Sequence, residues 1–342
     1  MSPKFRGESD EWLDDEGRHG SQPARRKTAT RENTAEIPLE KANATVIEVY
    51  PNQCRVALDD ELTTLLCSYR RNGVRKQLDI RERTFVAVGD RVVISEIGRE
   101  VGKESGVVEG VCRRENMLSR PSPGRDEGSL RQVIGANLDR VVIVVSAKTP
   151  DFSPGLVDRF LVAILAAGID PVICITKIDL VDSPGAPLWG IYSKLGFLVY
   201  EVSSKTELGV DALREEILGQ RVLFCGQSGV GKTSLLRVLL GTNIGKVNPV
   251  SVVTGKGKHT TTSTVMLTGP KGARWMDTPG MSEFGLADVK SENLSRYYPE
   301  FTGLGCDQIG CYHVGEAGCK AREHARYTGY VRIFQSLKAG GH

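Results

Sequence analysis

The sequence has no run of 18 or more apolar residues, which predicts that no helix spans a membrane. It also has no apolar segment near its N-terminus, which argues against a secretory signal. Strong charge is missing, because the 342 residues carry a formal net charge of only +3, and this balance does not by itself identify a nucleic-acid-binding protein. Eight cysteines are too few for a disulfide scaffold. We therefore expect a soluble, cytoplasmic protein of two or three domains.

Composition divides the chain into five parts. Residues 1–42 are rich in charged and small polar residues and predict a disordered tail. Acids slightly outnumber bases in this tail, unlike in a transit peptide. The sequence then predicts a small β-barrel over 43–116, a linker over 117–135, an α/β domain over 136–290 and a C-terminal module over 291–342.

The predicted barrel consists of short strands separated by turn residues. Their number suits an OB-fold, although periodicity alone does not choose that barrel. A basic segment, Arg70–Arg83, is flanked by Tyr69 and Phe85 and is either a nucleic-acid-binding rim or a solvated loop. The five expected strands are Ala44–Val49, Cys54–Leu58, Leu62–Tyr69, Phe85–Val88 and Arg91–Glu96.

Strands and helices alternate after the linker, which is typical of parallel βαβ units. The expected strands are Val141–Ser146, Pro171–Ile175, Leu198–Val202 and Arg221–Cys225, and the expected helices are Leu156–Ala167, Leu188–Gly196, Val210–Leu218 and Ser234–Leu240. Five cysteines scattered through the chain are expected to be core thiols: Cys54, Cys67, Cys112, Cys174 and Cys225.

The segment between the last of these strands and its helix matches G-x-x-x-x-G-K-[ST], the phosphate-binding P-loop, in the required strand–loop–helix context. Glycines let backbone N–H groups converge on phosphate oxygens. Lys232 is expected to reach the terminal phosphates and to assist catalysis, and Thr233 to ligate Mg²⁺ through its hydroxyl. The expected nucleotide contacts are Gly226, Gln227, Ser228, Gly229, Val230, Gly231, Lys232, Thr233 and Ser234.

A second motif, Thr176-Lys177-Ile178-Asp179, resembles the guanine-reading [NT]-K-x-D element of GTPases. The carboxylate of Asp179 can accept both guanine N1–H and N2–H₂, whereas adenine offers no such pair, so an ATPase has no use for this motif. Lys177 can lie along the base, and Thr176 replaces the commoner Asn. The segment Ser203-Ser204-Lys205 lies where GTPases place a backbone amide against guanine O6.

The segment Asp277-Thr278-Pro279-Gly280 resembles the DxxG switch, with Asp277 outside the direct ligands of Mg²⁺ and Gly280 donating its N–H to the γ-phosphate. Either Thr260 or Thr261 is expected to bind Mg²⁺ from a switch loop. Met281 stands where Ras-like GTPases carry the glutamine that orients water. His259 is then either the water-orienting catalytic residue or a switch-loop histidine without a catalytic part.

The order of the motifs is unusual, because the guanine-reading motif precedes the P-loop. This order predicts a circularly permuted GTPase domain, which is feasible because the termini of a compact domain often lie close together.

Three thiols and one imidazole fall within fourteen residues: Cys306, Cys311, His313 and Cys319. This closed Cys₃His set predicts a structural zinc site, the alternative being free surface thiols. A basic helix is expected over Lys320–Leu337, with His324 as an ordinary helix residue. Its cations are expected either to contact a phosphate backbone or to form a solvated face.

Taken together, these motifs are similar to those of the circularly permuted GTPases of small ribosomal subunit assembly, the RsgA (YjeQ) family. The resemblance covers residues 43–338 and implies an OB-fold, a permuted P-loop GTPase domain and a zinc module. It also implies one structural Zn²⁺ per chain, Mg²⁺ with GTP, and binding to the small (30S) ribosomal subunit and its rRNA late in maturation. In such a family the subunit stimulates GTP hydrolysis and the protein then leaves.

Three further expectations concern partners and mechanism. We expect a monomer without a membrane partner. A regulatory GTP-binding switch that acts on a protein partner remains the alternative function. Because the zinc module follows Gly280 closely in sequence, we hypothesise that γ-phosphate contact there reorients the module.

Overall fold

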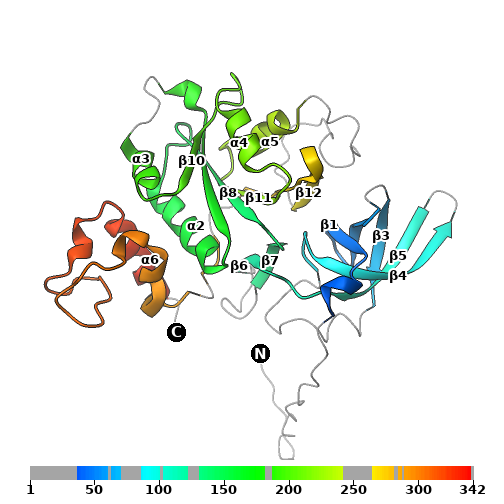
Figure 1. The fold of residues 1–342 in the computed structure, drawn as a ribbon, viewed down its shortest axis with the longest axis horizontal. Coiled ribbons are helices and arrows are strands. Elements are labelled where there is room, and N and C mark those ends of the chain that lie inside the picture. The colour runs from blue at the N-terminus through cyan, green and yellow to red at the C-terminus, as the bar shows by residue number, and fades with distance from the viewer. Residues whose placement is uncertain are drawn as a thin grey trace, which may run out of the picture. The chain divides into compact units, whose positions relative to one another are not determined.

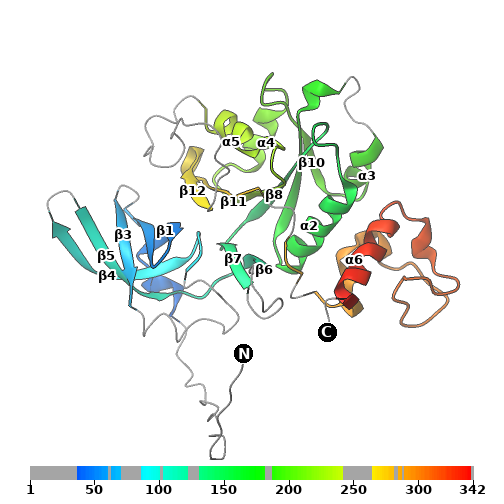
Figure 2. The ribbon, with the colours of Figure 1, turned by 180° about the vertical axis from the view of Figure 1, so that it is seen from behind.

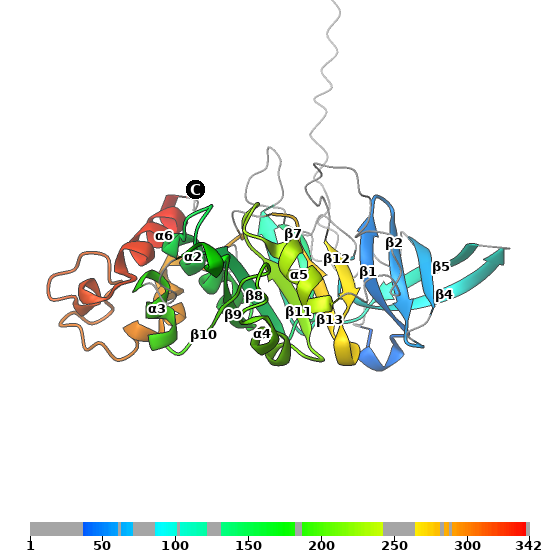
Figure 3. The ribbon, with the colours of Figure 1, turned by 90° about the horizontal axis from the view of Figure 1, so that it is seen from above.

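The computed structural model describes residues 37–60, 63–70, 86–100, 103–121, 131–181, 187–241, 264–280, 284–286 and 289–339 (Figures 1, 2 and 3). The chain divides into two compact units, 1–35 and 36–342, and every contact below belongs to the second. Most of the predicted tail and most of the basic Arg70–Arg83 segment lie outside the described residues. Ile37, within the predicted tail, forms a bridge with Cys112, and a 3₁₀ helix follows at Leu39–Lys41.

Five strands form the N-terminal barrel: β1 (Ala44–Tyr50), β2 (Gln53–Leu58), β3 (Thr64–Tyr69), β4 (Arg91–Glu100) and β5 (Lys103–Val111). Their hydrogen-bonded order is β1-β2-β3-β5-β4, and β4 also pairs with β1, so the sheet closes on itself. Alternate residues such as Val46, Val56 and Val108 fill the interior. This confirms the predicted OB-type barrel.

One predicted barrel strand is wrong and one real strand was missed. Residues 86–88 are buried but form no strand, and the chain turns at residues 88–89. Strand β5 contains Gly106 and Gly110, which read as breakers in the sequence. A Cβ on Gly106 would lie 2.9 Å from Ile94 Cγ2 and 3.1 Å from Cys67 Sγ, so close packing inside the barrel requires glycine there.

The predicted linker carries an antiparallel pair of strands, β6 (Met117–Pro121) and β7 (Arg131–Ala136). Leu118 and Ile134 are buried in the main core of the α/β domain, which gives this hairpin an apolar face to fold against.

Strands and helices alternate in the α/β domain, as predicted. The described elements are β8 (Arg140–Ser146), α2 (Pro154–Ala166), β9 (Asp170–Thr176), α3 (Pro187–Lys194), β10 (Leu198–Glu201), α4 (Val210–Glu216), β11 (Arg221–Cys225), α5 (Lys232–Leu240), β12 (Val265–Thr268) and β13 (Arg274–Asp277). The strands pair in the order β10-β9-β8-β11-β13-β12, and all but β12 run parallel. Two buried clusters cover the two faces of the sheet, one around α2 and α3 and the other around α4 and α5.

The C-terminal module contains short 3₁₀ helices and the final helix α6 (Tyr327–Ala339), which packs on α2 (Figure 1). The 3₁₀ helices are Ser291–Tyr297, Pro299–Phe301 and Lys320–Glu323. The prediction of one helix over Lys320–Leu337 is wrong, because helical structure is interrupted between Glu323 and Tyr327. His324 has extended backbone angles there, and its ring packs against Phe301. No helix in the described ranges is long and apolar enough to cross a membrane.

The five cysteines expected in the core are all buried, from Cys54 in the barrel to Cys225 at the end of β11. Burial raises the pKa of Cys112, and more strongly that of Cys174 and Cys225, so these thiols stay protonated near neutral pH.

Candidate functional site

The P-loop connects the end of β11 to the start of α5. Gly226 has φ of 146°, and a Cβ there would overlap the carbonyl oxygen of Val144 on the neighbouring strand, so the position admits only glycine. Gly229 and Gly231 also have positive φ, of 80° and 98°. The turn therefore depends on the two glycines that the motif fixes, Gly226 and Gly231, and on Gly229 at one of its variable positions.

Lys232 is the first residue of α5 and is only 7% exposed. Its Nζ donates to the carbonyl oxygens of Gly226 at 2.7 Å and Gln227 at 2.9 Å. Burial lowers the pKa of Lys232, and nearby Asp277 opposes that shift. The ammonium group therefore lies inside the loop, and Thr233 beside it is exposed in the first turn of the helix.

The end of β13 lies against the P-loop. A Cβ on Gly280 would lie 2.9 Å from both Cα and N of Ser228, so the DxxG glycine touches the phosphate-binding backbone. Thr278 donates its hydroxyl to Phe224 O at 2.7 Å and fixes this approach.

Asp277, the last residue of β13, has a buried carboxylate oxygen, Oδ1, without a hydrogen-bond partner among the described residues. Burial raises the pKa of Asp277 to about 6, although Lys232 lowers it. The buried carboxylate oxygen interacts with Lys232, and Thr233 directly follows that lysine in the chain. An acidic oxygen and a hydroxyl at the end of the P-loop fit a Mg²⁺ ion and its bound water.

The Thr176–Asp179 motif begins at the last residue of β9 and contacts the P-loop directly. The Thr176 hydroxyl donates to the carbonyl oxygen of Val230 and is only 1% exposed. Lys177, with φ of 57°, donates through Nζ to Gly229 O at 2.6 Å and to Thr149 O. Thr176 thus makes a structural bond to the loop although it stands in place of Asn.

Asp179 is oriented by the next strand–loop connection. The hydroxyl of Ser203 donates to Asp179 Oδ1 at 2.7 Å. The same Ser203 oxygen accepts the backbone N–H of Lys205 at 3.2 Å and of Thr206 at 3.1 Å. Because Asp179 is exposed, its carboxylate remains accessible to the base of a bound nucleotide.

The structure therefore brings together four of the segments that the sequence analysis singled out. The P-loop contacts Thr176 and Lys177, Asp179 contacts Ser203, and Gly280 contacts Ser228. The sequence analysis did not predict that Lys177 bonds to the Thr149 carbonyl. A backbone carbonyl can come from any residue type, so the segment after β8 gave no signal for it. His259, Thr260, Thr261 and Met281 lie outside the described residues.

The Cys₃His set of the C-terminal module forms a compact cluster. All four ligand atoms lie within 4.8 Å of one another, and each of the three Sγ atoms lies 3.5 Å from His313 Nδ1. A tetrahedral zinc ion with bonds of about 2.3 Å to sulfur and 2.0 Å to nitrogen spaces these atoms about 3.5 Å apart. The arrangement fits one structural metal ion with all four positions filled by protein.

The loop around this cluster is held by its own contacts. Glu316 accepts the backbone N–H of Tyr312 at 2.9 Å and of Val314 at 2.6 Å. The His313 ring packs on Phe301 at 5.3 Å between centroids. These contacts place the imidazole among the thiols without requiring a large apolar core.

The predicted basic helix needs a correction. Arg326 is 2% exposed and pairs with Asp158 of α2 at 2.7 Å, so it cannot lie on a solvated face. Arg322 donates to Gly315 O at 2.6 Å, and Lys338 pairs with Glu292 at 3.1 Å. The pattern of cations in the sequence did not reveal that one of them is buried against another domain.

Comparisons with known proteins agree with this geometry. A family model described as RsgA GTPase matches residues 111–287. Two curated relatives are named small ribosomal subunit biogenesis GTPase RsgA. The one from Klebsiella pneumoniae is 38% identical over 272 residues, which cover 74% of this chain and 75% of the relative. The one from Yersinia enterocolitica is 37% identical over 287 residues, which cover 78% and 80%. The chain belongs to the RsgA GTPase family.

Solved structures extend the similarity to the fold. YjeQ from Thermotoga maritima superposes with a TM-score of 0.65 at 29% identity, covering 87% of this chain and 98% of that one. YloQ, described as a circularly permuted GTPase, gives a TM-score of 0.60 at 26% identity, covering 86% and 94%. The permuted GTPase fold predicted from motif order is confirmed, and family membership makes the chain a GTP hydrolase.

Proposed function

We propose that this GTPase binds the small (30S) ribosomal subunit and its rRNA, acts in the subunit's late maturation, and is released when the subunit stimulates GTP hydrolysis. The observation that carries the proposal is the identity of 36–38% over most of the chain with relatives named for small ribosomal subunit biogenesis. We propose that the protein acts in the cytoplasm, where ribosomal subunits mature, and that it acts as a monomer.

The proposed roles at the nucleotide site follow from the contacts described above. Lys232 exchanges the carbonyl oxygens of Gly226 and Gln227 for terminal phosphate oxygens, which gain more from a buried ammonium group than neutral carbonyls do. The N–H of Gly280 meets the γ-phosphate, since this residue already abuts Ser228. Asp179, held by Ser203, reads the guanine edge.

We propose further that Thr233, with Thr260 or Thr261, holds Mg²⁺ and that Asp277 supports it. Bound Mg²⁺ neutralises charge on the phosphates. His259 is proposed to orient the attacking water, because Met281 has no group that could do so. The Cys306, Cys311, His313 and Cys319 cluster is proposed to hold one structural zinc ion per chain.

The test is GTP turnover by the full-length protein with and without purified small ribosomal subunits, with large subunits as the matched control. We expect strong stimulation by small subunits alone. Equal rates with both subunits, or no stimulation by either, would contradict the proposed function and leave the family assignment in place.

A further inference from the structure

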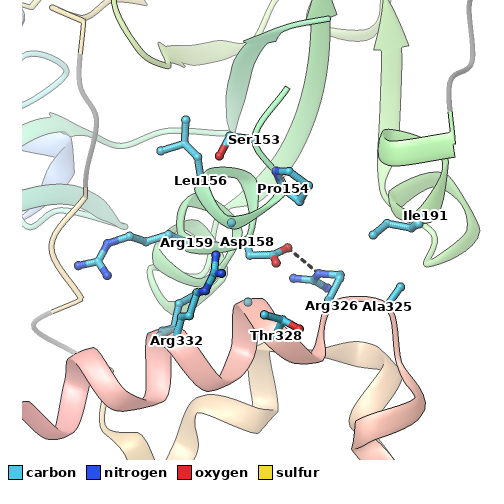
Figure 4. Close-up of a pocket in the computed structure, with 13 residues that line it drawn as sticks. Ser153, Pro154, Leu156, Asp158, Arg159, Ile191, Ala325, Arg326, Thr328 and Arg332 are labelled. Carbon is cyan, nitrogen blue, oxygen red and sulfur yellow. Dashed lines mark hydrogen bonds and ion pairs between the residues drawn. The ribbon is translucent and has the colours of Figure 1, made fainter. Parts of the chain in front are cut away.

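A cavity of about 460 Å³ lies between the first turns of α2 and the start of α6. None of the residues proposed to contact GTP lines it. Its volume falls in the range of small-ligand sites, about 300–1,000 Å³. Figure 4 shows its lining, which includes four charged residues: Asp158, Arg159, Arg326 and Arg332.

Arg326 brings an incompletely satisfied donor to this cavity. Its side chain is 1% exposed, its Nε donates to Asp158 at 2.7 Å, and its Nη1 donates to Glu300 at 3.1 and 3.2 Å. Its Nη2 is buried without a hydrogen-bond partner in the described ranges. The guanidinium also lies over the Tyr298 ring, 4.4 Å from its centroid, but this contact supplies no hydrogen-bond acceptor for Nη2. A ligand that brings an acceptor to Nη2 would remove the cost of an unpaired buried donor.

Asp158 cannot be that acceptor as well. Its Oδ1 already accepts from Arg326 and from Tyr192 at 3.0 Å. Its Oδ2 packs against α6 where Gly329 leaves room, since a Cβ on that glycine would overlap this oxygen. The carboxylate is therefore committed to holding the two helices together.

The rest of the charged lining is positive. In Figure 4 the guanidinium of Arg332 rises from α6 toward α2, and that of Arg159 extends away from Asp158. Arg159 Nε is also buried without a partner in the described part of the chain. The three arginines of the lining are opposed by two carboxylates, Asp158 of the lining and Glu300, which pairs with Arg326. The group therefore carries one net positive charge.

The start of α2 adds to this positive field. The helix has 13 residues, no acid in its first turn and Pro154 at its first position. Ser153, the N-cap residue, makes no capping hydrogen bond with its side chain and lines the cavity. The partial positive charge of a helix N-terminus favours an anion here.

We propose that this cavity binds a phosphate group, taken either from an RNA backbone or from a free phosphate ester. Phosphate oxygens only accept hydrogen bonds, and they match the donors that Arg326 and Arg332 present. The site is separate from the P-loop, and the proposal does not depend on the proposed function.

The first test is calorimetric titration of inorganic phosphate into the full-length, zinc-loaded protein with the P-loop saturated by GDP and Mg²⁺. We compare wild type with Arg332→Gln and with Arg296→Gln, which removes the same charge from an exposed position of the same module outside the cavity. We expect Arg332→Gln to weaken phosphate binding about tenfold or more and Arg296→Gln to leave it unchanged. Absence of phosphate binding by the wild type, or equal affinity in both variants, overturns the proposal.

The second test separates the two sources of phosphate. Fluorescence anisotropy measures binding of a labelled single-stranded oligoribonucleotide over a range of salt concentrations. If RNA is the source, Arg332→Gln weakens binding more than Arg296→Gln and reduces the salt slope by about one. If phosphate binds in calorimetry but both variants bind RNA alike, the site takes a free phosphate ester. Neither assay contains ribosomal subunits, so failure of the subunit-stimulation experiment affects neither result.

Discussion

Replacing Arg326 by Met tests how strongly a single buried cation joins the C-terminal module to the GTPase domain. The variant leaves Asp158 and Glu300, whose side chains are 2% and 3% exposed, without their shared partner. Breaking a buried ion pair by removing one member costs about 3–5 kcal/mol. For a cooperative unit of roughly 200 residues this lowers the melting temperature by roughly 6–20 °C, at about 2–4 °C per kcal/mol.

The loss of stability in Arg326→Met should depend on pH through the carboxyl group of Asp158. Burial already raises the pKa of Asp158 in the wild type, and Arg326 opposes the rise. Without the arginine, the folded-state pKa of this carboxyl rises further above its unfolded value. The penalty is then full above the folded pKa and shrinks as pH falls through it, because protonation removes the buried charge. The gap in stability between wild type and Arg326→Met should therefore narrow from pH 7 toward pH 5.

Differential scanning calorimetry of the zinc-loaded protein measures both effects, with exposed Arg296→Met as the control. Adding Asp158→Asn and Glu300→Gln to Arg326→Met should recover part of the loss, because neutral amides need no counter-ion. Equal melting temperatures for Arg326→Met and Arg296→Met, or a gap that stays constant from pH 7 to pH 5, would refute the reasoning.

The remaining predictions concern the metal and nucleotide sites. Elemental analysis should find one zinc per chain, and Cys311→Ser or chelation should lower the melting temperature, whereas Cys174→Ser should retain the metal. Asp179→Asn should weaken GTP binding about 10–150-fold in equilibrium titrations and improve binding of XTP, and Asp170→Asn, exposed at the start of β9, should change neither. Gly226→Ala should lower stability and abolish nucleotide binding, while Gly190→Ala, with open space around its Cβ, should raise stability by up to about 1 kcal/mol in denaturant unfolding.

Local chemistry made much of the nucleotide site predictable. The P-loop and guanine-reading motifs each need a few residue types at fixed spacing after a buried strand, so both the strands β9 and β11 and the loops after them could be placed. The same holds for the Cys₃His cluster, whose four side chains lie within one short segment. Motif order then predicted the permutation, because the [NT]-K-x-D pattern precedes the P-loop and the sequence after Gly280 contains no second copy of it.

What could not be predicted depends on contacts between distant segments. Strand β5 was missed because its glycine at position 106 is required by tertiary packing against Ile94 of the neighbouring strand β4 and Cys67 of β3. Arg326 was expected either to contact a phosphate backbone or to lie on a solvated face, because its partner Asp158 lies 168 residues earlier and gave no local signal. Single-sequence patterns report which residue types occur, and they carry no information on which distant side chain occupies the space beside them.

The same distant contacts change the expected route between the two functional sites. The sequence suggested only the covalent link from Gly280 to the metal cluster. The structure adds a second link through two sets of side-chain contacts. Lys177 joins Gly229 of the P-loop to Thr149, which lies in the connection that leads into α2. Asp158 of α2 then holds Arg326, directly before α6. Because this second link passes through the Asp158–Arg326 ion pair, one substitution can interrupt it while the covalent link from Gly280 stays intact. The contribution of each link to the C-terminal module can then be measured separately.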